Sequence, residues 1–354
     1  MLLVILLKKK LKSWLKPLKA LINIISILKG AFVYKRTGIT PEKAYFSLIS
    51  LYCLTNGYSN AFLSWLLKLQ RHTYILPHAN GVLGDLDSAE IHRVVQEIRE
   101  DGYYVFNQLL SVDICDKLTS LALTNECNLR GSLDADIKMS IYDRTNPIAV
   151  TYWLKEEDLI ANPDIQALMA DLSILAIAQA YLETQPILDI VAMWWSTALS
   201  KTACTDSAQL YHFDMDRIKW LKFLIYLTDV TSDNGPHCYI AGSHQIGGKP
   251  KEILSLGYAR ISDEDIIKFY PKEKFIEVTA PKGTIIAGDT LCFHKGKPLK
   301  QCDRLVLELE FTNSLFGGSY QKVELKNINN SNLSESVKNH SRAFQKFILN
   351  YKDE

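Results

Sequence analysis

The stretch from Tyr211 to Asp216 contains a His-x-Asp pair whose spacing suits metal binding. If it is a strand, His212 and Asp214 point to the same face, because side chains alternate along a strand. An imidazole and a carboxylate on one face can grip a single ion, and His294 is the best candidate for a third ligand. Two imidazoles and one carboxylate form the facial triad typical of non-haem Fe(II) oxygenases.

Arg304 follows His294 by ten residues and opens an apolar run that ends at Phe311. A guanidinium in a protein interior needs an anionic partner, because an unpaired buried charge is very unfavourable. A dicarboxylate co-substrate, bound through two parallel N–H groups, would supply that partner. We therefore expect Arg304 to lie beside the metal site and to bind such a co-substrate.

Other histidines of the chain compete for the third ligand position. The chain has eight histidines, and most of them need no function. His237 and His244 lie near a Gly-Ser-His turn and are the rivals of His294. We predict His294 as the ligand, because Arg304 follows it at a suitable distance.

The carboxylate position also has two candidates. Asp216 shares a face with Asp214, since both lie an even number of residues from His212. The two-residue spacing brings the side chains of His212 and Asp214 to one point, so we predict Asp214 as the ligand. Asp216 is expected to orient a loop through Arg217.

The segment from Ile218 to Leu227 alternates between two faces. One face is apolar and is formed by Leu221, Phe223, Ile225 and Leu227. Lys222 and Tyr226 share the other face. In a jelly roll one strand face looks into the barrel, where a ligand binds. Lys222 and Tyr226 are therefore candidates to contact the co-substrate, and for Lys222 an exposed edge strand is an equal alternative.

These residues, in this order, resemble the phytanoyl-CoA dioxygenase family of 2-oxoglutarate-dependent oxygenases. Residues 101–106 and 110–113 are similar to the family's opening strand and helix. Residues 233–244 are similar to its Asn-Gly-Pro turn and Pro-Gly-Ser-His element, with Ala241 in place of the usual proline. The resemblance covers roughly residues 101–316.

The resemblance implies an Fe(II)- and 2-oxoglutarate-dependent dioxygenase that uses O2 to hydroxylate a small organic or lipid-like substrate. Succinate and CO2 are the expected co-products. It implies that His212, Asp214 and His294 hold the iron and that Arg304 binds 2-oxoglutarate. Halogenating relatives have a small residue at the position of Asp214, so a carboxylate there favours hydroxylation.

The same resemblance and the pattern of elements predict an α+β fold. Its core is a double-stranded β-helix (jelly roll, cupin-like) with flanking helices and an N-terminal helical extension. We divide the chain into a helical extension (1–87), the dioxygenase domain (88–320) and a polar C-terminal tail (321–354) with a short helix from Ser341 to Tyr351.

Local signals predict several elements before and within this domain. A loop is expected over residues 76–88, and Trp194 and Trp195 must face opposite ways on one strand. The predicted helices cover residues 40–54, 59–69, 88–99, 111–123 and 162–182, and the predicted strands include 102–106 and 187–199.

The first 41 residues carry the positive charge of the chain. They contain eight Lys and one Arg and no acid, which leaves 31 basic and 39 acidic residues, a charge of −8, for the remainder. Apolar residues at helical spacing with lysines around the other side predict a basic amphipathic helix, kinked or interrupted at Pro17. Residues 1–30 could contact an anionic membrane surface, or could pack on this protein or on a second copy; the packing interpretation is favoured.

The overall composition indicates a globular protein with 47% hydrophobic and 22% charged residues. A formal net charge of +1 gives no general attraction for nucleic acid. Seven scattered cysteines without a Cys-x-x-Cys pair indicate reduced thiols in the cytoplasm.

Two functions from other classes remain as alternatives. The first is a zinc-dependent jelly-roll hydrolase or isomerase, which would not need Arg304. The second is a non-catalytic binding module at a membrane surface, which would not need a complete set of metal ligands.

Overall fold

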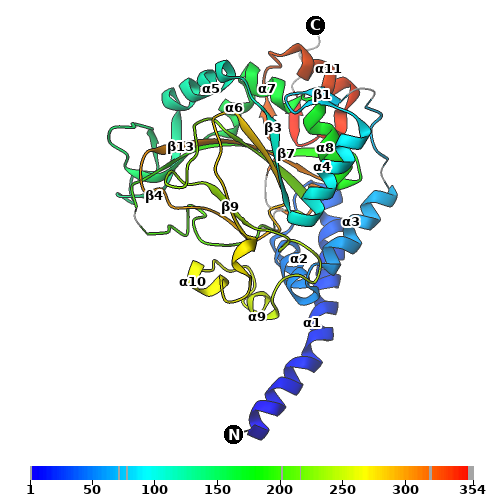
Figure 1. Cartoon of the computed structure of the whole chain (residues 1–354). Coiled ribbons are helices and arrows are strands. Elements are labelled where there is room, and N and C mark those ends of the chain that lie inside the picture. The colour runs from blue at the N-terminus through cyan, green and yellow to red at the C-terminus, as the bar shows by residue number, and fades with distance from the viewer. Residues whose placement is uncertain are drawn as a thin grey trace.

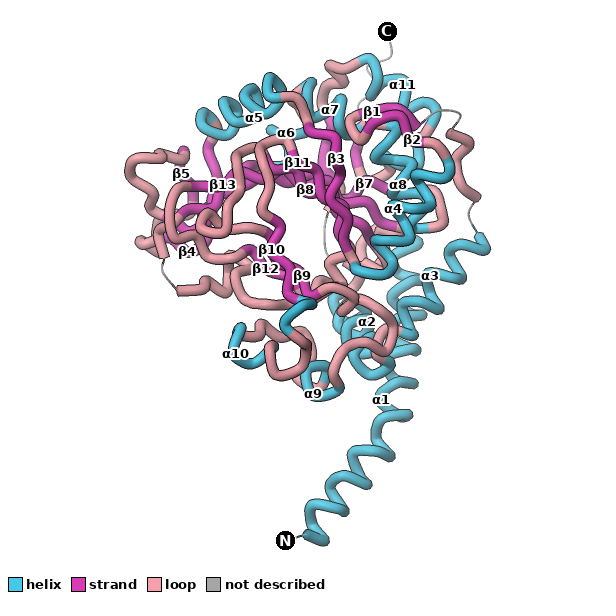
Figure 2. The backbone as a smooth tube through the Cα atoms, viewed as in Figure 1, coloured by secondary structure: helices cyan, strands magenta, loops and turns pink. Residues whose placement is uncertain are grey.

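The structure is a computed structural model. It describes residues 2–349 apart from 71, 77–78, 201, 216 and 319–320, with side chains from residue 16 onward. Two antiparallel sheets face each other, and helices cover the outer side of the larger sheet (Figures 1 and 2).

The larger sheet forms one wall of the barrel. Its four central strands pair in the order β11-β8-β13-β7, all antiparallel. Among the described residues the sheet contains, in spatial order, β3 (Tyr103–Leu109), β11 (Thr284–Gly288), β8 (Trp220–Tyr226), β13 (Asp303–Thr312), β7 (Ile187–Thr197), β6 (Ala149–Leu154), β4 (Glu126–Ser132) and β5 (Met139–Ile141).

The smaller sheet forms the opposite wall. It contains β10 (Phe275–Val278), β9 (His237–Ile240) and β12 (His294–Gly296). An antiparallel bridge between His212 and His294 adds the segment 211–212 to its edge. The chain crosses back and forth between the two sheets as in a double-stranded β-helix, in the order β7, segment 211–212, β8, β9, β10, β11, β12 and β13. The predicted jelly roll is therefore confirmed.

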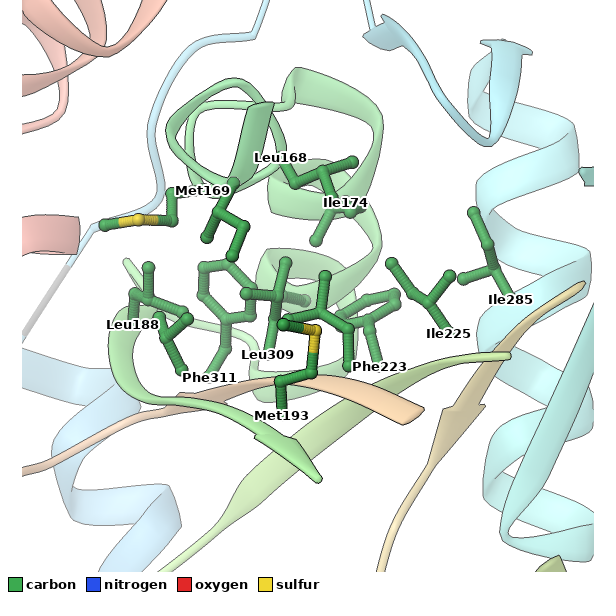
Figure 3. Packing of buried hydrophobic residues seen from close by; sticks show 14 of the residues in the cluster. Leu168, Met169, Ile174, Leu188, Met193, Phe223, Ile225, Ile285, Leu309 and Phe311 are labelled. Atoms are coloured by element: carbon green, nitrogen blue, oxygen red, sulfur yellow. The ribbon is translucent and has the colours of Figure 1, made fainter. Parts of the chain in front are cut away.

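The outer face of the larger sheet is apolar and packs under two helices, α7 (Pro163–Met169) and α8 (Leu172–Leu182). Strand alternation sends Phe223 and Ile225 of β8 to this side. Figure 3 shows them with their neighbours from the strands and helices, among them Met193, Leu309, Phe311, Met169 and Ile174. This layer is the main core of the protein.

Residues 163–182 form two helices where the sequence predicted one. Asp171 ends the first and caps the second, because its side chain accepts a hydrogen bond from the backbone N–H of Ile174 at 3.0 Å. Ser173 also donates to this carboxylate. An aspartate at this spacing competes with the helix backbone and starts a new helix.

Most other predicted helices are present with small shifts at their ends. Asp87 caps α4 and Ser111 caps α5, because each side chain accepts a hydrogen bond from a backbone N–H of the first turn. The predicted helices are α2 (Glu42–Thr55), α3 (Tyr58–Gln70), α4 (Ser88–Asp101) and α5 (Val112–Thr124). The short helices α6 (Glu156–Ile160), α9 (Lys251–Leu254) and α10 (Asp263–Ile266) add to them.

Two stretches predicted as loop or polar segment contain strands. The predicted loop 76–88 holds a hairpin, β1 (Ala79–Gly81) and β2 (Gly84–Leu86). The polar stretch after α5 holds β4, β5 and β6, which extend the larger sheet beyond β7. The side chains of β4 and β5 are partly exposed, so these two strands lack a continuous apolar signal, whereas β6 is short and mostly buried.

The C-terminal segment differs from the predicted helix at 341–351. The helix α11 (Ser331–Asn339) begins earlier, because the Asn330 side chain caps its first backbone N–H groups. A 3-10 turn (Ser341–Phe344) and a parallel pair, β14 (Val323–Leu325) and β15 (Phe347–Leu349), complete it. Its apolar side chains, Leu333, Val337, Phe344 and Phe347 among them, lie in the main core.

The N-terminal helix α1 (Leu2–Thr37) runs through Pro17 without an interruption, and a kink at this residue stays a prediction. A proline removes one helix hydrogen bond, and the flanking turns persist here. The side chains of the predicted basic arc before residue 16 lie outside the described part. The N-terminal end of α1 projects from the body (Figure 1).

The later half of α1 packs on α2 and on the end of the barrel. Ile27 contacts this cluster together with Ala44, Leu48, Ile218 and Phe316. Among the described residues, two stretches are long and apolar enough to cross a bilayer: Lys16–Thr37, 17% buried, and Pro163–Leu182, 78% buried. The second is the core layer of α7 and α8.

Candidate active site

The structure brings His212, Asp214 and His294 together at one end of the barrel. Their ligand atoms lie within 4.8 Å of one another, and the three side chains are buried. His212 Nε2 is 3.6 Å and His294 Nε2 is 3.5 Å from the nearer Asp214 carboxylate oxygen. Two ligand atoms about 2.1 Å from one ion and at right angles lie about 3 Å apart, so this spacing fits a shared metal ion.

Backbone contacts orient both imidazoles. His212 Nδ1 lies 2.9 Å from the Leu210 carbonyl oxygen, and His294 Nδ1 lies 3.0 Å from the Cys292 carbonyl oxygen. A carbonyl only accepts hydrogen bonds, so each Nδ1 carries the proton and each Nε2 keeps its lone pair. Burial lowers the pKa of His212 to about 3 and also lowers the pKa of His294, which keeps both rings neutral.

The carboxylate of Asp214 belongs to a buried ionic cluster. Lys222 Nζ donates to Asp214 Oδ2 at 3.0 Å and lies 3.3 Å from both Glu308 and Glu310. Burial alone would raise the pKa of Asp214, but the charge of Lys222 brings it well below its ordinary value. Counted as ionised, these described side chains sum to −2, which a divalent metal ion would neutralise.

Arg304 is buried in the same cavity. Its guanidinium donates to the Gly235 carbonyl and, at 3.2 Å, to Ser196 Oγ. Within the described part of the chain, Nε has no hydrogen-bond partner and no carboxylate pairs with the group. Burial therefore lowers the pKa of Arg304. This charge needs an anion that the described residues do not supply.

Two glycines shape the surroundings of Arg304. Gly235 adopts a φ of +81°, a left-handed conformation that suits glycine, and this turn presents its carbonyl oxygen to the guanidinium. Asn234 stabilises the turn by accepting a hydrogen bond from Thr231 N and donating one to the Asp229 carbonyl. A Cβ on Gly296 would lie 3.3 Å from Arg304 Nη2, so a glycine keeps this space open.

A cavity of about 240 Å³ contains the triad and Arg304. Trp194 lines it and stacks on Trp153 with ring centroids 4.5 Å apart. Trp195 points to the outer core, where its indole N–H donates to the Ala122 carbonyl at 3.1 Å. The opposite orientation of the two tryptophans is as predicted.

The rival residues have different surroundings. His237 lines the cavity and stacks on His294 at 5.6 Å between ring centroids, outside the group of three converging ligands. His244 lies against the carbonyl of Arg99 and the Cys292 sulfur and does not line the cavity. Asp216, the rival carboxylate, lies outside the described residues.

Arg217 has an acidic partner far away in the chain. It forms a paired ionic contact with the buried Asp189, at 2.5 Å and 2.9 Å between nitrogen and oxygen. Such a bidentate pair fixes the chain just after the His-x-Asp segment.

Lys222 and Tyr226 point into the barrel, as the alternation of β8 predicted. Lys222 contacts the acidic cluster, and the Tyr226 hydroxyl donates to the Val278 carbonyl at 3.0 Å. Burial raises the pKa of Tyr226 to about 12, so it stays protonated. The contact of either residue with a co-substrate stays a prediction.

Sequence reasoning missed Glu308 and Glu310. Both lie in the run that follows Arg304 and were counted as part of an apolar strand. Residues at even spacing from Arg304 share its face, so Val306, Glu308 and Glu310 also point inward. The alternation of charged with apolar residues in this strand was the signal that could have found them.

A jelly roll that brings two imidazoles and a carboxylate next to a buried arginine defines the class of iron- and 2-oxoglutarate-dependent oxygenases. A family model for phytanoyl-CoA dioxygenase matches residues 98–301, more than half of the 354 residues. The chain therefore belongs to the phytanoyl-CoA dioxygenase family. It is an enzyme of this class, and its cofactors are iron and 2-oxoglutarate.

Several solved structures are similar to this chain. The epimerase SnoN from nogalamycin biosynthesis, non-heme and alpha ketoglutarate dependent, is 16% identical over 64% of this chain and 84% of its own, with a TM-score of 0.48. EctD from S. alaskensis is 18% identical over 68% and 80%, with a TM-score of 0.44. HygX from Streptomyces hygroscopicus, with nickel and 2-oxoglutarate bound, is 16% identical over 67% and 91%, with a TM-score of 0.45.

These TM-scores lie below 0.5, so the family assignment rests on the family match alone. No curated protein matches this sequence.

Proposed function

We propose that the protein hydroxylates an unactivated C–H bond of a small organic or lipid-like substrate, with succinate and CO2 as co-products. His212, Asp214 and His294 hold Fe(II), and Arg304 binds 2-oxoglutarate through its distal carboxylate. The observation that carries this proposal is one cavity that contains three converging ligand atoms and a buried guanidinium without an acidic partner among the described residues.

Iron with 2-oxoglutarate and O2 supplies the oxidation of a C–H bond, and the protein supplies position and charge. The two histidines present neutral Nε2 atoms because their Nδ1 protons are held by backbone carbonyls. Lys222 orients the Asp214 carboxylate by donating a hydrogen bond to one oxygen. Trp194 and the other cavity walls hold the substrate and limit the access of water.

The test uses the full chain without oxygen. Adding Fe(II) and then 2-oxoglutarate should give a weak visible metal-to-ligand charge-transfer band, which needs both the metal and the chelating co-substrate. Admitting O2 should then form succinate. A protein that binds Zn(II), gives no such band with Fe(II) and hydrolyses esters would point to the zinc alternative.

We further propose that the enzyme is cytoplasmic and that its N-terminal segment contacts a membrane surface. Leu21, Leu28 and Phe32 of α1 are 54%, 65% and 56% exposed. The opposite side of α1 packs on α2, where Asn23 donates to Ser50 Oγ at 2.9 Å. An apolar face away from the body, on a segment without acidic residues, supports a contact with anionic lipid.

A flotation assay with anionic and neutral vesicles tests the contact. The full chain should float with anionic vesicles at low salt and dissociate when salt is added. Replacing Leu21, Leu28 and Phe32 with Ser should abolish flotation and leave the barrel folded. If the full chain never floats and instead forms a dimer that the same changes dissociate, the apolar face binds a second copy.

A further inference from the structure

Arg260 lies at the edge of the active site, in the loop between α9 and α10. An antiparallel bridge pairs Tyr211 with Ile261, with hydrogen bonds of 3.0 Å and 2.8 Å. Antiparallel register therefore places Arg260 across from His212. Tyr211 and Ile261 pack in an outer apolar cluster, so the alternating neighbours His212 and Arg260 face the cavity, and both line it.

The guanidinium of Arg260 is incompletely satisfied. Its Nη1 is buried and, among the described residues, has no hydrogen-bond partner and no acidic partner. The neighbouring contact is with the ring of Tyr258, 5.9 Å from the guanidinium carbon. A buried N–H of a charged group without an acceptor is unfavourable, so this atom is suited to bind a ligand.

Arg260 lies close to the metal ligands. The bridge between Tyr211 and Ile261 sets it across from His212, and the cavity that it lines also contains Asp214 and His294. A group bound to Arg260 therefore lies in the same cavity as the metal ligands.

Arg260 and Arg304 occupy different sides of the metal ligands. In the smaller sheet the order is β9, β12 with His294, segment 211–212 with His212, then the bridge at Ile261. Arg304 bonds to Gly235, just before β9, whereas Arg260 lies beyond His212. One small dianion chelated at the metal and bound by Arg304 would leave Arg260 for a second anion.

Two tryptophans form a flat, aromatic part of the cavity wall. Trp153 and Trp194 stack with an interplanar angle of 13°, and Arg130 lies over the Trp153 ring at 4.1 Å. The cavity of about 240 Å³ is small for a ligand site, because such sites commonly measure roughly 300–1,000 Å³. It therefore suits a small substrate with a planar or apolar body.

We infer that the substrate is a small organic anion whose carboxylate or phosphate binds Arg260, with its apolar part against Trp153 and Trp194. This inference rests on the proposed function, because it assumes a metal and 2-oxoglutarate at the other positions. Arg260 then acts as a specificity-determining residue: by binding the anionic group of the substrate, it places a nearby C–H bond of the substrate in front of the metal.

The test measures binding to the anaerobic complex of full chain, Fe(II) and 2-oxoglutarate. Matched probes are phenylacetate with phenylacetamide, hexanoate with hexanamide, and phenyl phosphate with phenol. Binding is followed by ligand-observed NMR and by the shift of the visible band. At least one acid should bind about tenfold or more tightly than its neutral partner. Phosphate preferred over both carboxylates would identify the anion as a phosphate.

Three variants make the result specific. Arg260→Gln should abolish the preference for the acid, Arg260→Lys should keep part of it, and Arg93→Gln, on the exposed face of α4, should keep all of it. The visible band without probe should persist in all three. If no acid is preferred in the wild type, or if Arg260→Gln retains the preference, the inference is wrong.

Two further outcomes separate this inference from the proposed function. If Arg260→Gln loses the visible band itself, Arg260 serves 2-oxoglutarate and the inference is overturned. If the wild type gives no band with Fe(II) and 2-oxoglutarate, the proposed function is wrong, and the inference that rests on it is wrong too.

Discussion

On the outer face of β8, Phe223 and Ile225 pack under the helices α7 and α8, whereas on its inner face Lys222 and Tyr226 point into the barrel. The strand β13 shows the same division, with Leu309 outside and Glu308 inside. Neighbouring residues along one strand thus have different roles, in packing on one face and in the metal site on the other. The outer face stabilises the fold by apolar burial, and the inner face carries the charges that position a metal ion.

The largest expected effect is at the metal ligand on the inner side. Asp214→Ala should lower 2-oxoglutarate turnover by more than ~100-fold, because even the partners of a metal ligand commonly contribute 10–100-fold. Circular dichroism should show an intact fold. The exposed Asp113→Ala, in a helix, is the matched control. Turnover near the wild-type level would transfer the role to another carboxylate.

On the outer face, Phe223→Ala should lower the free energy of unfolding by about 3–5 kcal/mol, because it leaves a cavity in a fully buried layer. Urea unfolding measures the change. The affinity for Fe(II) at low temperature should remain that of the wild type. A large loss of iron affinity would mean that the two faces are not independent.

On the inner face, Lys222→Met should lower the stability of the metal-free protein by about 3–5 kcal/mol, because three buried carboxylates lose their shared cation. Fe(II) should raise the melting temperature of this variant more than that of the wild type, since a divalent ion replaces part of the lost charge. An equal rise in both proteins would show that the cluster and the metal act separately.

The smallest of the four effects concerns Arg304. Arg304→Lys keeps the charge and loses the planar fork, so the 2-oxoglutarate concentration for half-maximal formation of the visible band should rise about tenfold. Affinity for Fe(II) alone should change little. If iron and 2-oxoglutarate binding fall together, Arg304 is part of the fold and not a binding residue.

Features that depend on local periodicity and on the order of motifs could be predicted from the sequence. The alternation of β8, the opposite orientation of Trp194 and Trp195, and the convergence of His212, Asp214 and His294 follow from side-chain alternation combined with family order. The jelly roll followed from the resemblance. These features depend on few residues, each with a distinctive chemical type.

Other features depend on partners far away in the chain. The strands β4 and β5 are partly exposed, whereas β6 is short and mostly buried and pairs with β7, which lies more than 30 residues further along the chain. Asp171 caps α8 and so divides the one long helix that the apolar pattern predicted. Asn330 caps α11, which begins before the predicted C-terminal helix. The contacts of Lys222 with Glu308 and Glu310 join different strands, and no local spacing predicts them.

The loop between β9 and β10, residues 241–274, carries Arg260 and Tyr258, whereas the three metal ligands come from segments outside it. The metal ligands and the proposed anion-binding residue Arg260 are therefore encoded in different stretches of the gene, while Trp153 and Trp194 lie outside this loop. An exchange of this loop alone would replace the group that binds the anionic end of the substrate and would leave the three metal ligands and the two tryptophans in place.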